Sequence, residues 1–269
     1  MIRSMAFAVG LSVTASSAMA GEAWDAVKAQ LFDDRALRDG SQHISIDAPY
    51  RTFDDARTQI AAFVNAPTGL NLGRVYLVLD ENPMPVSAVF EMDQPQPRFF
   101  FDVTMRVNGP TPLHVVAETT DGQLFVAETF VKTSGQGACA APPGTDPELA
   151  LATLGDMELV VGGLVPVAGG AGLSTGSLRQ QVMDLDIQHP SHSGMQKDQL
   201  SLLFIPMRYV EDVDIDLDGQ GYVGLTGSIS LSENPRVSLS VPGDAQSVDV
   251  TMTDTSGTVR HLHKRLAGY

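Results

Sequence analysis

The stretch Leu113–Lys132, LHVVAETTDGQLFVAETFVK, holds two apolar runs separated by a short polar turn. The runs 113–119 and 124–132 are rich in the β-branched and aromatic residues that strands prefer. Asp121-Gly122 between them is typical of a two-residue hairpin turn, in which both central residues take a left-handed backbone. The stretch therefore predicts a β-hairpin.

The same strand pattern continues toward the N-terminus. Val75, Leu77 and Leu79 alternate with Tyr76 and Val78, so this strand is predicted to be buried on both faces. Short strands with regular turns are typical of an antiparallel sandwich. With the hairpin, the predicted strands of this half are His43–Asp47, Gln59–Val64, Gly73–Leu79, Val86–Met92, Arg98–Val107, Leu113–Thr119 and Leu124–Lys132.

A second set of strands follows after a long interruption, with hairpin turns at Asp218-Gly219 and Ser256-Gly257. The sequence thus predicts an all-β chain with two Ig-like antiparallel β-sandwich domains, a short N-terminal helix over Glu22–Phe32 and an inter-domain linker. The predicted strands of the second half are Gln181–Gln188, Gln199–Pro206, Tyr209–Leu217, Gly221–Ser228, Arg236–Val241, Ser247–Thr253 and Thr258–His263.

The interruption between the two sets begins at Thr133. It contains the only cysteine, then a short predicted helix over Asp146–Leu154 with Thr145 or Asp146 as its cap. The uncharged, glycine-rich stretch Leu159–Leu178 is interpreted as linker or strand, because its glycines and Pro166 make a poor membrane helix. The predicted boundaries are a signal peptide at 1–20, a first domain at 21–134, an arm and linker at 135–177 and a second domain at 178–269.

The first twenty residues have the pattern of a secretory signal. Arg3 precedes the apolar stretch Met5–Val13, and Ala18-Met19-Ala20 provides small residues at the cleavage spacing. We therefore expect a periplasmic protein that begins near Gly21 and has no membrane span. Its 16 basic and 32 acidic residues give a formal charge of −16, which argues against nucleic acid and anionic membrane surfaces as partners.

Cys139 lies in the run TSGQGACAAPPG, residues 133–144. Glycines precede it and prolines follow, so no regular element is expected through it, and the thiol is predicted to be exposed. Gly135 and Gly137 are expected to make this arm flexible. A single thiol in an exported chain suggests an intermolecular disulfide or a thiol kept for chemistry.

No metal site or cofactor is expected. The acidic run Asp214–Gly219 resembles the start of a calcium loop, but Leu225 stands at the twelfth position, where that loop needs a bidentate acid. Four histidines suggest a zinc site only weakly, and solvated side chains or turn residues are the simpler interpretation of them. These histidines are His189, His192, His261 and His263. Nucleotide-binding, haem and nucleophile-elbow motifs are absent from the sequence, so we expect no enzyme.

Several short motifs, in their order and spacing, resemble a known pair of proteins. Residues 41–139 resemble SoxY, the sulfur carrier of the periplasmic sulfur-oxidising system, in ISIDAP (44–49), DENPMP (80–85), DGQL (121–124) and GQGAC (135–139). Residues 181–269 resemble its partner SoxZ in IQHP (187–190), Gly194, Ile205-Pro206 and Asp218-Gly219. Fused carriers associated with quinoprotein dehydrogenases are the nearest type.

The resemblance implies two Ig-like sandwiches in contact within one chain, and Cys139 as the residue that holds a sulfur intermediate covalently. The expected partners are periplasmic sulfur-oxidising enzymes or a quinoprotein dehydrogenase system. Two functions therefore stay open: a covalent carrier that presents Cys139 to enzymes, and a non-covalent accessory or adaptor module for a quinoprotein dehydrogenase. Here alanines flank the cysteine and the chain continues past it, whereas the SoxY arm ends the chain.

Overall fold

Fifteen strands in two sheets form the body of the protein, which the computed structural model describes over residues 19–135, 137–165 and 180–266. The first sheet has nine strands in the order β1-β8-β7-β4-β5-β12-β11-β14-β15 and the second has six in the order β2-β3-β6-β13-β10-β9. The strands are β1 (Leu37–Asp39), β2 (Ile44–Asp47), β3 (Thr58–Asn65), β4 (Leu72–Leu79), β5 (Val86–Gln96), β6 (Arg98–Met105), β7 (Thr111–Thr119), β8 (Leu124–Val131), β9 (Met157–Leu164), β10 (Gln180–Ile187), β11 (Val210–Leu217), β12 (Gln220–Gly227), β13 (Arg236–Pro242), β14 (Ser247–Asp254) and β15 (Val259–Arg265).

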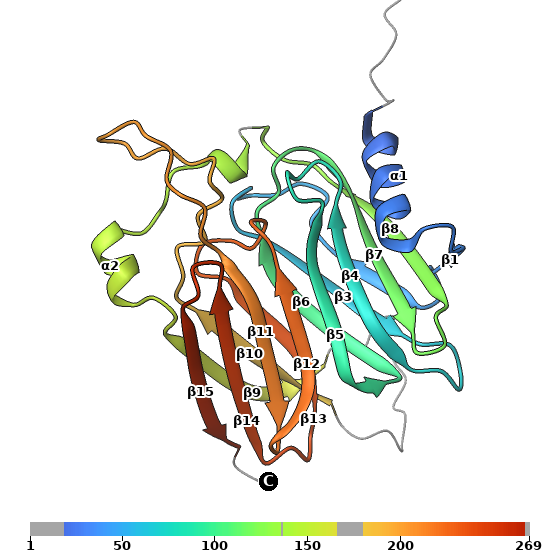
Figure 1. The fold of residues 1–269 in the computed structure, drawn as a ribbon. Helices are drawn as coiled ribbons and strands as arrows, with labels where there is room; N and C mark the ends of the chain where they lie inside the picture. The colour runs from blue at the N-terminus through green and yellow to red at the C-terminus, as the bar shows by residue number, and fades with distance from the viewer. Residues whose placement is uncertain (1–18, 136, 166–179, 267–269) are drawn as a thin grey trace, which may run out of the picture.

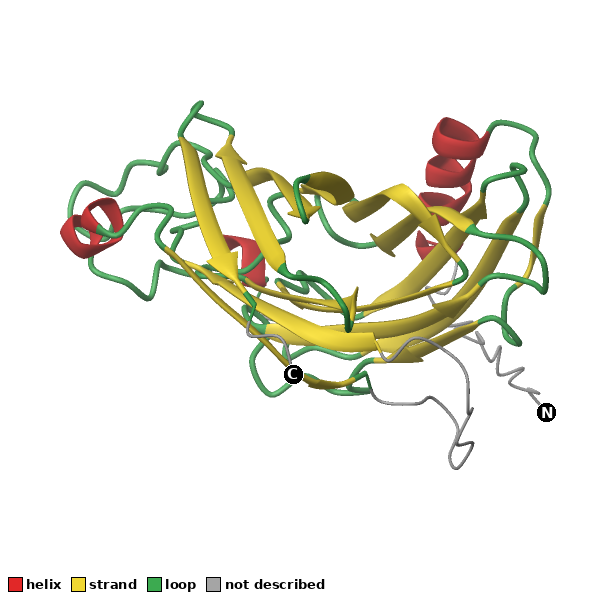
Figure 2. Cartoon of the chain, turned by 90° about the horizontal axis from the view of Figure 1, so that it is seen from below, coloured by secondary structure: helices red, strands yellow, loops and turns green. Residues whose placement is uncertain are grey.

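Each half of the chain is a sandwich, and the two sandwiches join edge to edge. Strands β1–β8 and β9–β15 each contribute to both sheets. In one sheet β5 pairs antiparallel with β12, with Phe90 opposite Leu225, and in the other β6 pairs with β13, with Phe101 opposite Leu239. Figure 2 shows both layers curving across the whole molecule. The predicted all-β fold is confirmed, and its two halves share continuous sheets.

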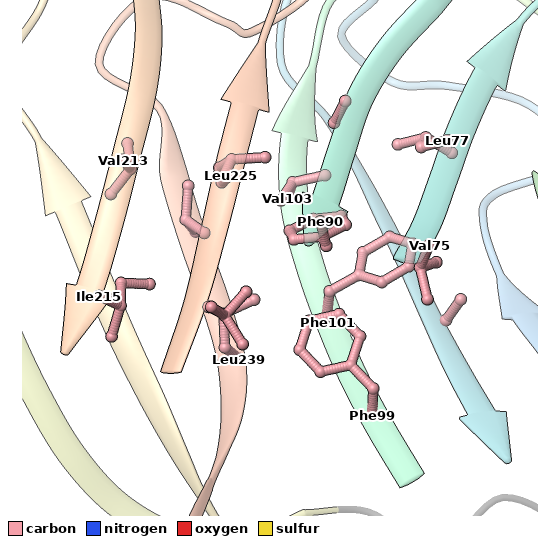
Figure 3. Close-up of a cluster of buried hydrophobic side chains, with 14 of the residues drawn as sticks. Val75, Leu77, Phe90, Phe99, Phe101, Val103, Val213, Ile215, Leu225 and Leu239 are labelled. Atoms are coloured by element: carbon pink, nitrogen blue, oxygen red, sulfur yellow. The ribbon is translucent and has the colours of Figure 1, made fainter. Parts of the chain in front are cut away.

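One hydrophobic core runs through both halves between the sheets. Figure 3 shows Phe90, Phe99 and Phe101 packed beside side chains of the second half such as Leu225 and Leu239. The rings of Phe90 and Phe101 are stacked with centroids 4.7 Å apart. Because the cluster is not divided at the domain boundary, apolar burial stabilises the two halves as one unit.

The predicted N-terminal helix is confirmed as α1 (Met19–Phe32), which lies at one end of the molecule against the first sheet (Figure 1). Phe32 packs edge-on against Tyr76 of β4, with ring centroids 5.2 Å apart. Trp24 stacks on His114 of β7 at 3.9 Å. The apolar face of the helix therefore covers outward-facing side chains of β4 and β7. No helix among the described residues is long and apolar enough to span a membrane.

The three predicted hairpin turns each join two paired strands, but only Asp218-Gly219 has a left-handed backbone at both residues; at Asp121-Gly122 and Ser256-Gly257 only the glycine does. Asp218 and Gly219 have φ of 52° and 75°, as the two central residues of a tight hairpin turn between β11 and β12 require. The Asp218 carboxylate accepts hydrogen bonds from the backbone N–H groups of Gln246 and Ser247 at 2.8 Å. This side chain therefore ties the turn to the start of β14.

The structure differs from the sequence prediction in two segments. The predicted strand Gln199–Pro206 is wrong, because Asp198 instead caps a turn by accepting from the N–H groups of Leu200 and Ser201 at 3.2 and 2.7 Å. The stretch Leu159–Leu178, interpreted as linker or strand, is strand β9 up to Leu164, and its residues 166–178 lie outside the described part. Strand β1 was not predicted.

Candidate functional site

Cys139 is fully buried, so the predicted exposed thiol is wrong in this structure. The residue lies in a single 3-10 turn, Ala138–Ala140, that begins after Gly137. Gly135 and Gly137 have φ of 84° and 76°, in the left-handed region that favours glycine. The two glycines let the chain turn back onto the protein, and the small alanines beside Cys139 let it approach closely. The predicted flexibility of these glycines stays a prediction.

The buried cysteine is held between the two halves of the chain. Its backbone N–H donates to Oδ1 of Asn108, which follows β6, at 3.2 Å. Its carbonyl oxygen accepts a hydrogen bond from the hydroxyl of Ser193, which belongs to the second half. We call the boundary between the two sandwiches the seam, and residues 137–145 the Cys139 loop.

Burial keeps the thiol protonated. It raises the pKa of Cys139 to about 11, and the nearby Arg106 guanidinium offsets only part of this effect. The thiolate is the nucleophilic form of cysteine, so a thiol with this pKa is poorly reactive near neutral pH. The docked loop therefore protects the sulfur atom.

Arg106 anchors the seam beneath the loop. This buried side chain donates from Nη1 to the carbonyl oxygens of Ser191 and Leu231, at 2.7 and 2.6 Å, both in the second half. The Arg106 carbonyl accepts from Nδ2 of Asn82, which also donates to Ser230 Oγ at 2.8 Å. Burial lowers the pKa of Arg106 from its ordinary value. The hydrogen bonds to these carbonyl oxygens replace the hydrogen bonds to water that the guanidinium loses on burial.

A carboxylate holds the far end of the Cys139 loop. Glu233 accepts from the N–H groups of Gly144 and Thr145, each at 2.7 Å, and these bonds help to hold its pKa below the ordinary value although burial acts in the opposite direction. An open pocket of about 250 Å³ lies between this part of the loop and the seam. Its charged lining residues are Asp54, Arg57, Arg106 and Glu233, so the pocket contains two positive and two negative side chains.

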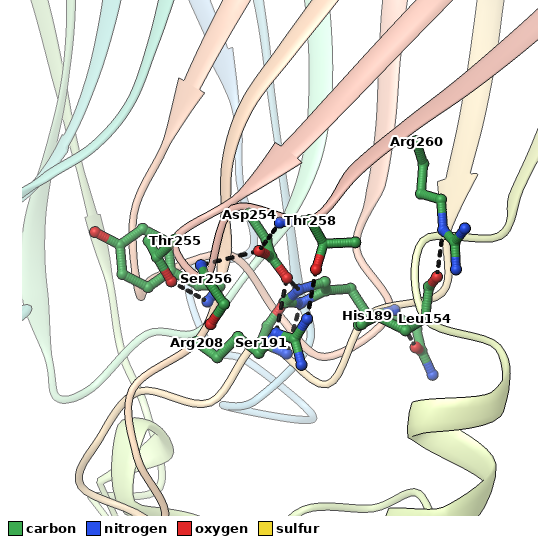
Figure 4. A network of polar contacts seen from close by, with 11 residues as sticks. Leu154, His189, Ser191, Arg208, Asp254, Thr255, Ser256, Thr258 and Arg260 are labelled. Atoms are coloured by element: carbon green, nitrogen blue, oxygen red, sulfur yellow. Dashed lines mark hydrogen bonds and ion pairs between the residues drawn. The ribbon is translucent and has the colours of Figure 1, made fainter.

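A second polar cluster lies on the same end of the second half (Figure 4). The buried His189 accepts from the N–H of Ser191 at Nδ1, at 2.9 Å, so its Nε2–H faces Asp254 Oδ2 at 3.3 Å. Arg208 donates to the same Asp254 oxygen at 2.7 Å. Burial lowers the pKa of His189 to about 4, so the ring is neutral at pH 7. This cluster fixes the segment that leads to Ser193.

Of the other histidines weighed from the sequence, His192 lies beside Ser193 with Nδ1 3.0 Å from Gln196 Oε1, whereas the two on β15 lie elsewhere. His261 and His263 on β15 contact Thr251 Oγ1 and Asp249 Oδ1 at 2.9 and 2.7 Å. Within residues 19–135, 137–165 and 180–266 no group of three or more histidine, cysteine, aspartate or glutamate side chains is arranged to hold a metal ion. Leu225, at the position where a calcium loop would need an acid, is buried on β12.

The residues that hold Cys139 were missed in the sequence. They come from three separate stretches of the chain and form no recognisable catalytic or binding motif; they are Arg106 with Asn108, Ser193 and Glu233. Only the edge-to-edge pairing of β6 with β13 brings them together. The one signal available was the Asp80–Pro85 motif, which contains the seam residue Asn82.

Family models match both halves of the chain. The model of sulfur oxidation protein SoxY matches residues 28–139, so that this match ends at Cys139, and the model of sulphur oxidation protein SoxZ matches residues 179–264. A search of curated proteins gave no match.

Three solved structures are similar to parts of this chain. The sulfur carrier protein SoxY from Chlorobium limicola f thiosulfatophilum is 22% identical over 42% of this chain and 98% of its own, with a TM-score of 0.37. A superoxide reductase (neelaredoxin) from Ignicoccus hospitalis is 17% identical over 34% of this chain and 80% of its own, with a TM-score of 0.27. A β-glucuronidase from Parabacteroides merdae is 11% identical over 83% of this chain and 24% of its own, with a TM-score of 0.22. With a SoxY domain followed by a SoxZ domain, the chain belongs to these sulfur-oxidation families as a fused SoxYZ-like protein.

Proposed function

We propose that this protein is an exported carrier of sulfur oxidation, in which Cys139 holds the cargo covalently while partner enzymes act on it. The chain itself supplies no catalytic acid–base set in this proposal; it is a substrate of those enzymes. The observation that carries the proposal is the position of the only cysteine. It is the last residue of the SoxY match, and it lies where the SoxY half meets the SoxZ half.

A carrier of this kind needs two states of the Cys139 loop. In the docked state described above, the thiol is buried and protonated, which protects it from oxidation and disulfide formation. In a released state, the backbone contacts to Asn108, Ser193 and Glu233 are broken, and the sulfur atom reaches solvent or an enzyme cleft. These contacts lie outside the two sheets, so the loop can open locally without unfolding of the core.

The decisive experiment is an intact-mass measurement. The chain is recovered from its own host during growth on a reduced sulfur compound, in parallel with the Cys139→Ser variant. We expect added mass on the wild type that a thiol reductant removes, and none on the variant. A wild-type chain that carries a free thiol under every growth condition would exclude covalent carriage.

A second function is favoured by the burial of the thiol. If Cys139 stays docked, the protein acts as a non-covalent accessory or adaptor module, with a quinoprotein dehydrogenase as the candidate partner. In that case Cys139→Ser supports the host pathway as well as the wild type does. The two functions therefore give opposite results for the same substitution.

We place this activity in the periplasm. The support is the signal pattern of residues 1–20, with Arg3, the apolar stretch Met5–Val13 and the Ala18-Met19-Ala20 cleavage motif. N-terminal sequencing of the protein from a periplasmic fraction tests this, with a start near Gly21 as the expected result. Recovery of the chain with Met1 from the cytoplasmic fraction alone would contradict it.

A further inference from the structure

An exposed apolar loop projects from the second half close to the Cys139 loop. Residues 199–207, QLSLLFIPM, contain no charged side chain, although the whole chain has a formal charge of −15. Leu200 is 96% exposed, Leu203 is 70% exposed and Phe204 is 63% exposed. Figure 1 shows this segment as the orange loop that extends away from the sheets at the upper left. We call residues 199–207 the apolar loop.

The apolar loop has a defined shape. Asp198 Oδ1 accepts from the hydroxyl and the N–H of Ser201, both at 2.7 Å, and the N–H of Leu202 donates to the Asp198 carbonyl at 2.9 Å. Lys197 and Phe204 form a backbone bridge below the tip. The turn holds Leu202 at φ 60°, a conformation that costs energy for a leucine. The apolar side chains are thus exposed on an ordered turn that the Asp198 hydrogen bonds stabilise.

The base of the apolar loop is part of the seat of Cys139. Ser193, which donates to the Cys139 carbonyl, stands six residues before the loop and is buried. Gln196 is buried too, accepts from the Ser193 N–H at 3.3 Å and lines the pocket beside Ala141 and Pro142. Arg208, just after the loop, donates its backbone N–H to the His192 carbonyl at 2.9 Å. A displacement of the apolar loop on binding would therefore move the segment of Ser193 and its hydrogen bond to the Cys139 carbonyl.

We propose that the apolar loop is the docking element for the partner enzyme that acts on Cys139, and that it inserts into an apolar groove of that enzyme. An enzyme that reaches the sulfur atom must cover the surface beside the Cys139 loop, and the apolar loop stands on that surface. Exposed apolar side chains gathered in one place are typical of protein interfaces. This inference rests on the proposed function for the identity of the partner, although docking itself does not need the thiol.

The apolar loop could instead bind a second copy of this chain or a membrane surface, but the negative charge of the chain disfavours both. Two copies of this acidic chain repel each other at long range, and an acidic protein is repelled by an anionic membrane surface. An enzyme groove with an apolar floor and a basic rim matches both the loop and the chain around it. Docking would also pull on the segment of Ser193 and so favour release of the Cys139 loop.

The first test is cross-linking in the host. A photo-reactive amino acid replaces Leu203 in the wild-type chain and in the Cys139→Ser variant, and it replaces Val160 of β9, which is half exposed, as the control position. We expect one defined cross-linked partner protein from position 203 in both chains and none from position 160. A cross-link to a second copy, a cross-link to lipid, or no cross-link at position 203 would overturn the proposal.

The second test separates docking from carriage. The double variant Leu200→Ser/Leu203→Ser changes only exposed side chains, so its melting temperature and its rate of thiol modification in purified form should equal those of the wild type. We expect host cells that carry this double variant to oxidise the reduced sulfur compound at least tenfold more slowly, and host cells with Val160→Ser to oxidise it at the wild-type rate.

The outcomes for the two variants are distinct. If the loop variant abolishes oxidation of the sulfur compound in the host while Cys139→Ser does not, the docking proposal is supported and covalent carriage is excluded. If host cells with the loop variant oxidise the sulfur compound at the wild-type rate, the docking proposal is wrong, whatever the result for Cys139→Ser.

Discussion

The hydroxyl of Ser193 donates a hydrogen bond to the carbonyl oxygen of Cys139, and this bond joins the SoxZ half to the cysteine at the end of the SoxY half. The contact makes the position of the thiol depend on both domains. In two separate proteins it would be an intermolecular contact, whereas fusion makes it intramolecular, so that it re-forms at a high effective concentration whenever the loop returns.

Ser193→Ala should expose the thiol more often. A hydrogen bond of this type contributes about 1 kcal/mol, so its loss should raise the released fraction of the Cys139 loop about fivefold. The measurement is the rate of reaction of Cys139 with a disulfide reagent near pH 7. Thr251→Ala, which removes a surface contact to His261, is the control and should leave the rate unchanged. Equal rates in all three proteins would mean that Ser193 does not hold the loop.

The docked loop should lose stability in alkaline solution. Burial raises the pKa of Cys139 from 9.0 to about 11, so the neutral thiol stabilises the docked form below about pH 9, and this contribution disappears as the pH rises through 11. Between about pH 7 and about pH 10.5 the wild type should lose up to about 2 kcal/mol more unfolding free energy than Cys139→Ser. Denaturant titrations of both proteins at the two pH values measure this. The same pH dependence in both would show that the thiol titrates as if it were exposed.

Acid should weaken the protein through His189. Burial lowers the pKa of this ring to about 4 in the folded state, while the unfolded chain binds the proton near pH 6.5. The unfolded state then binds more protons, so stability falls as the pH drops from about 7 toward 4. We expect a loss of about 2 kcal/mol between about pH 7.5 and about pH 5.

Asp254 also contributes to the loss of stability in acid. Hydrogen bonds, among them those from Thr258, Arg208 and His189, hold the pKa of Asp254 low, against the effect of burial, and its stabilising contribution is also lost in acid. The variant His189→Gln should remove the histidine part of the pH dependence and keep the Asp254 part. A variant as sensitive to acid as the wild type would locate the effect elsewhere.

Arg106→Lys should destabilise the seam by about 3 kcal/mol. A lysine keeps the charge but lacks the planar group that donates to the carbonyl oxygens of Ser191 and Leu231. Urea titration measures the loss. Arg74→Lys is the matched control, since Arg74 pairs with Glu91 on the surface and such pairs contribute about 0–1 kcal/mol. Similar losses in both variants would contradict a special role for Arg106.

The two halves should unfold together. β5 pairs with β12, β6 pairs with β13, and one core runs through both sandwiches, so neither half can open without exposing apolar surface of the other. Calorimetry should therefore show a single transition with equal calorimetric and van't Hoff enthalpies. Two resolved transitions would mean that the halves behave as independent domains.

Much of the fold followed from short-range pattern. Alternating apolar residues and turn pairs such as Asp121-Gly122 and Asp218-Gly219 located thirteen of the fifteen strands, because strand period and turn geometry are local properties of the backbone. The error at Gln199–Pro206 has a local cause as well. Asp198 caps a turn there, and the apolar residues that looked like a strand face solvent instead.

The amino-acid sequence by itself determined the all-β class, the two families, the acidic charge and the single cysteine as the candidate carrier. Only the tertiary structure decided that Cys139 is buried in the seam and that the apolar loop projects beside it. The glycines at 135 and 137 permit either an extended arm or a turned-back loop, because glycine accepts both backbone conformations. The turned-back loop is held by Asn108 of the same half and by Ser193 and Glu233 of the second half. The last two reach the loop only because the edges of the two sandwiches pair.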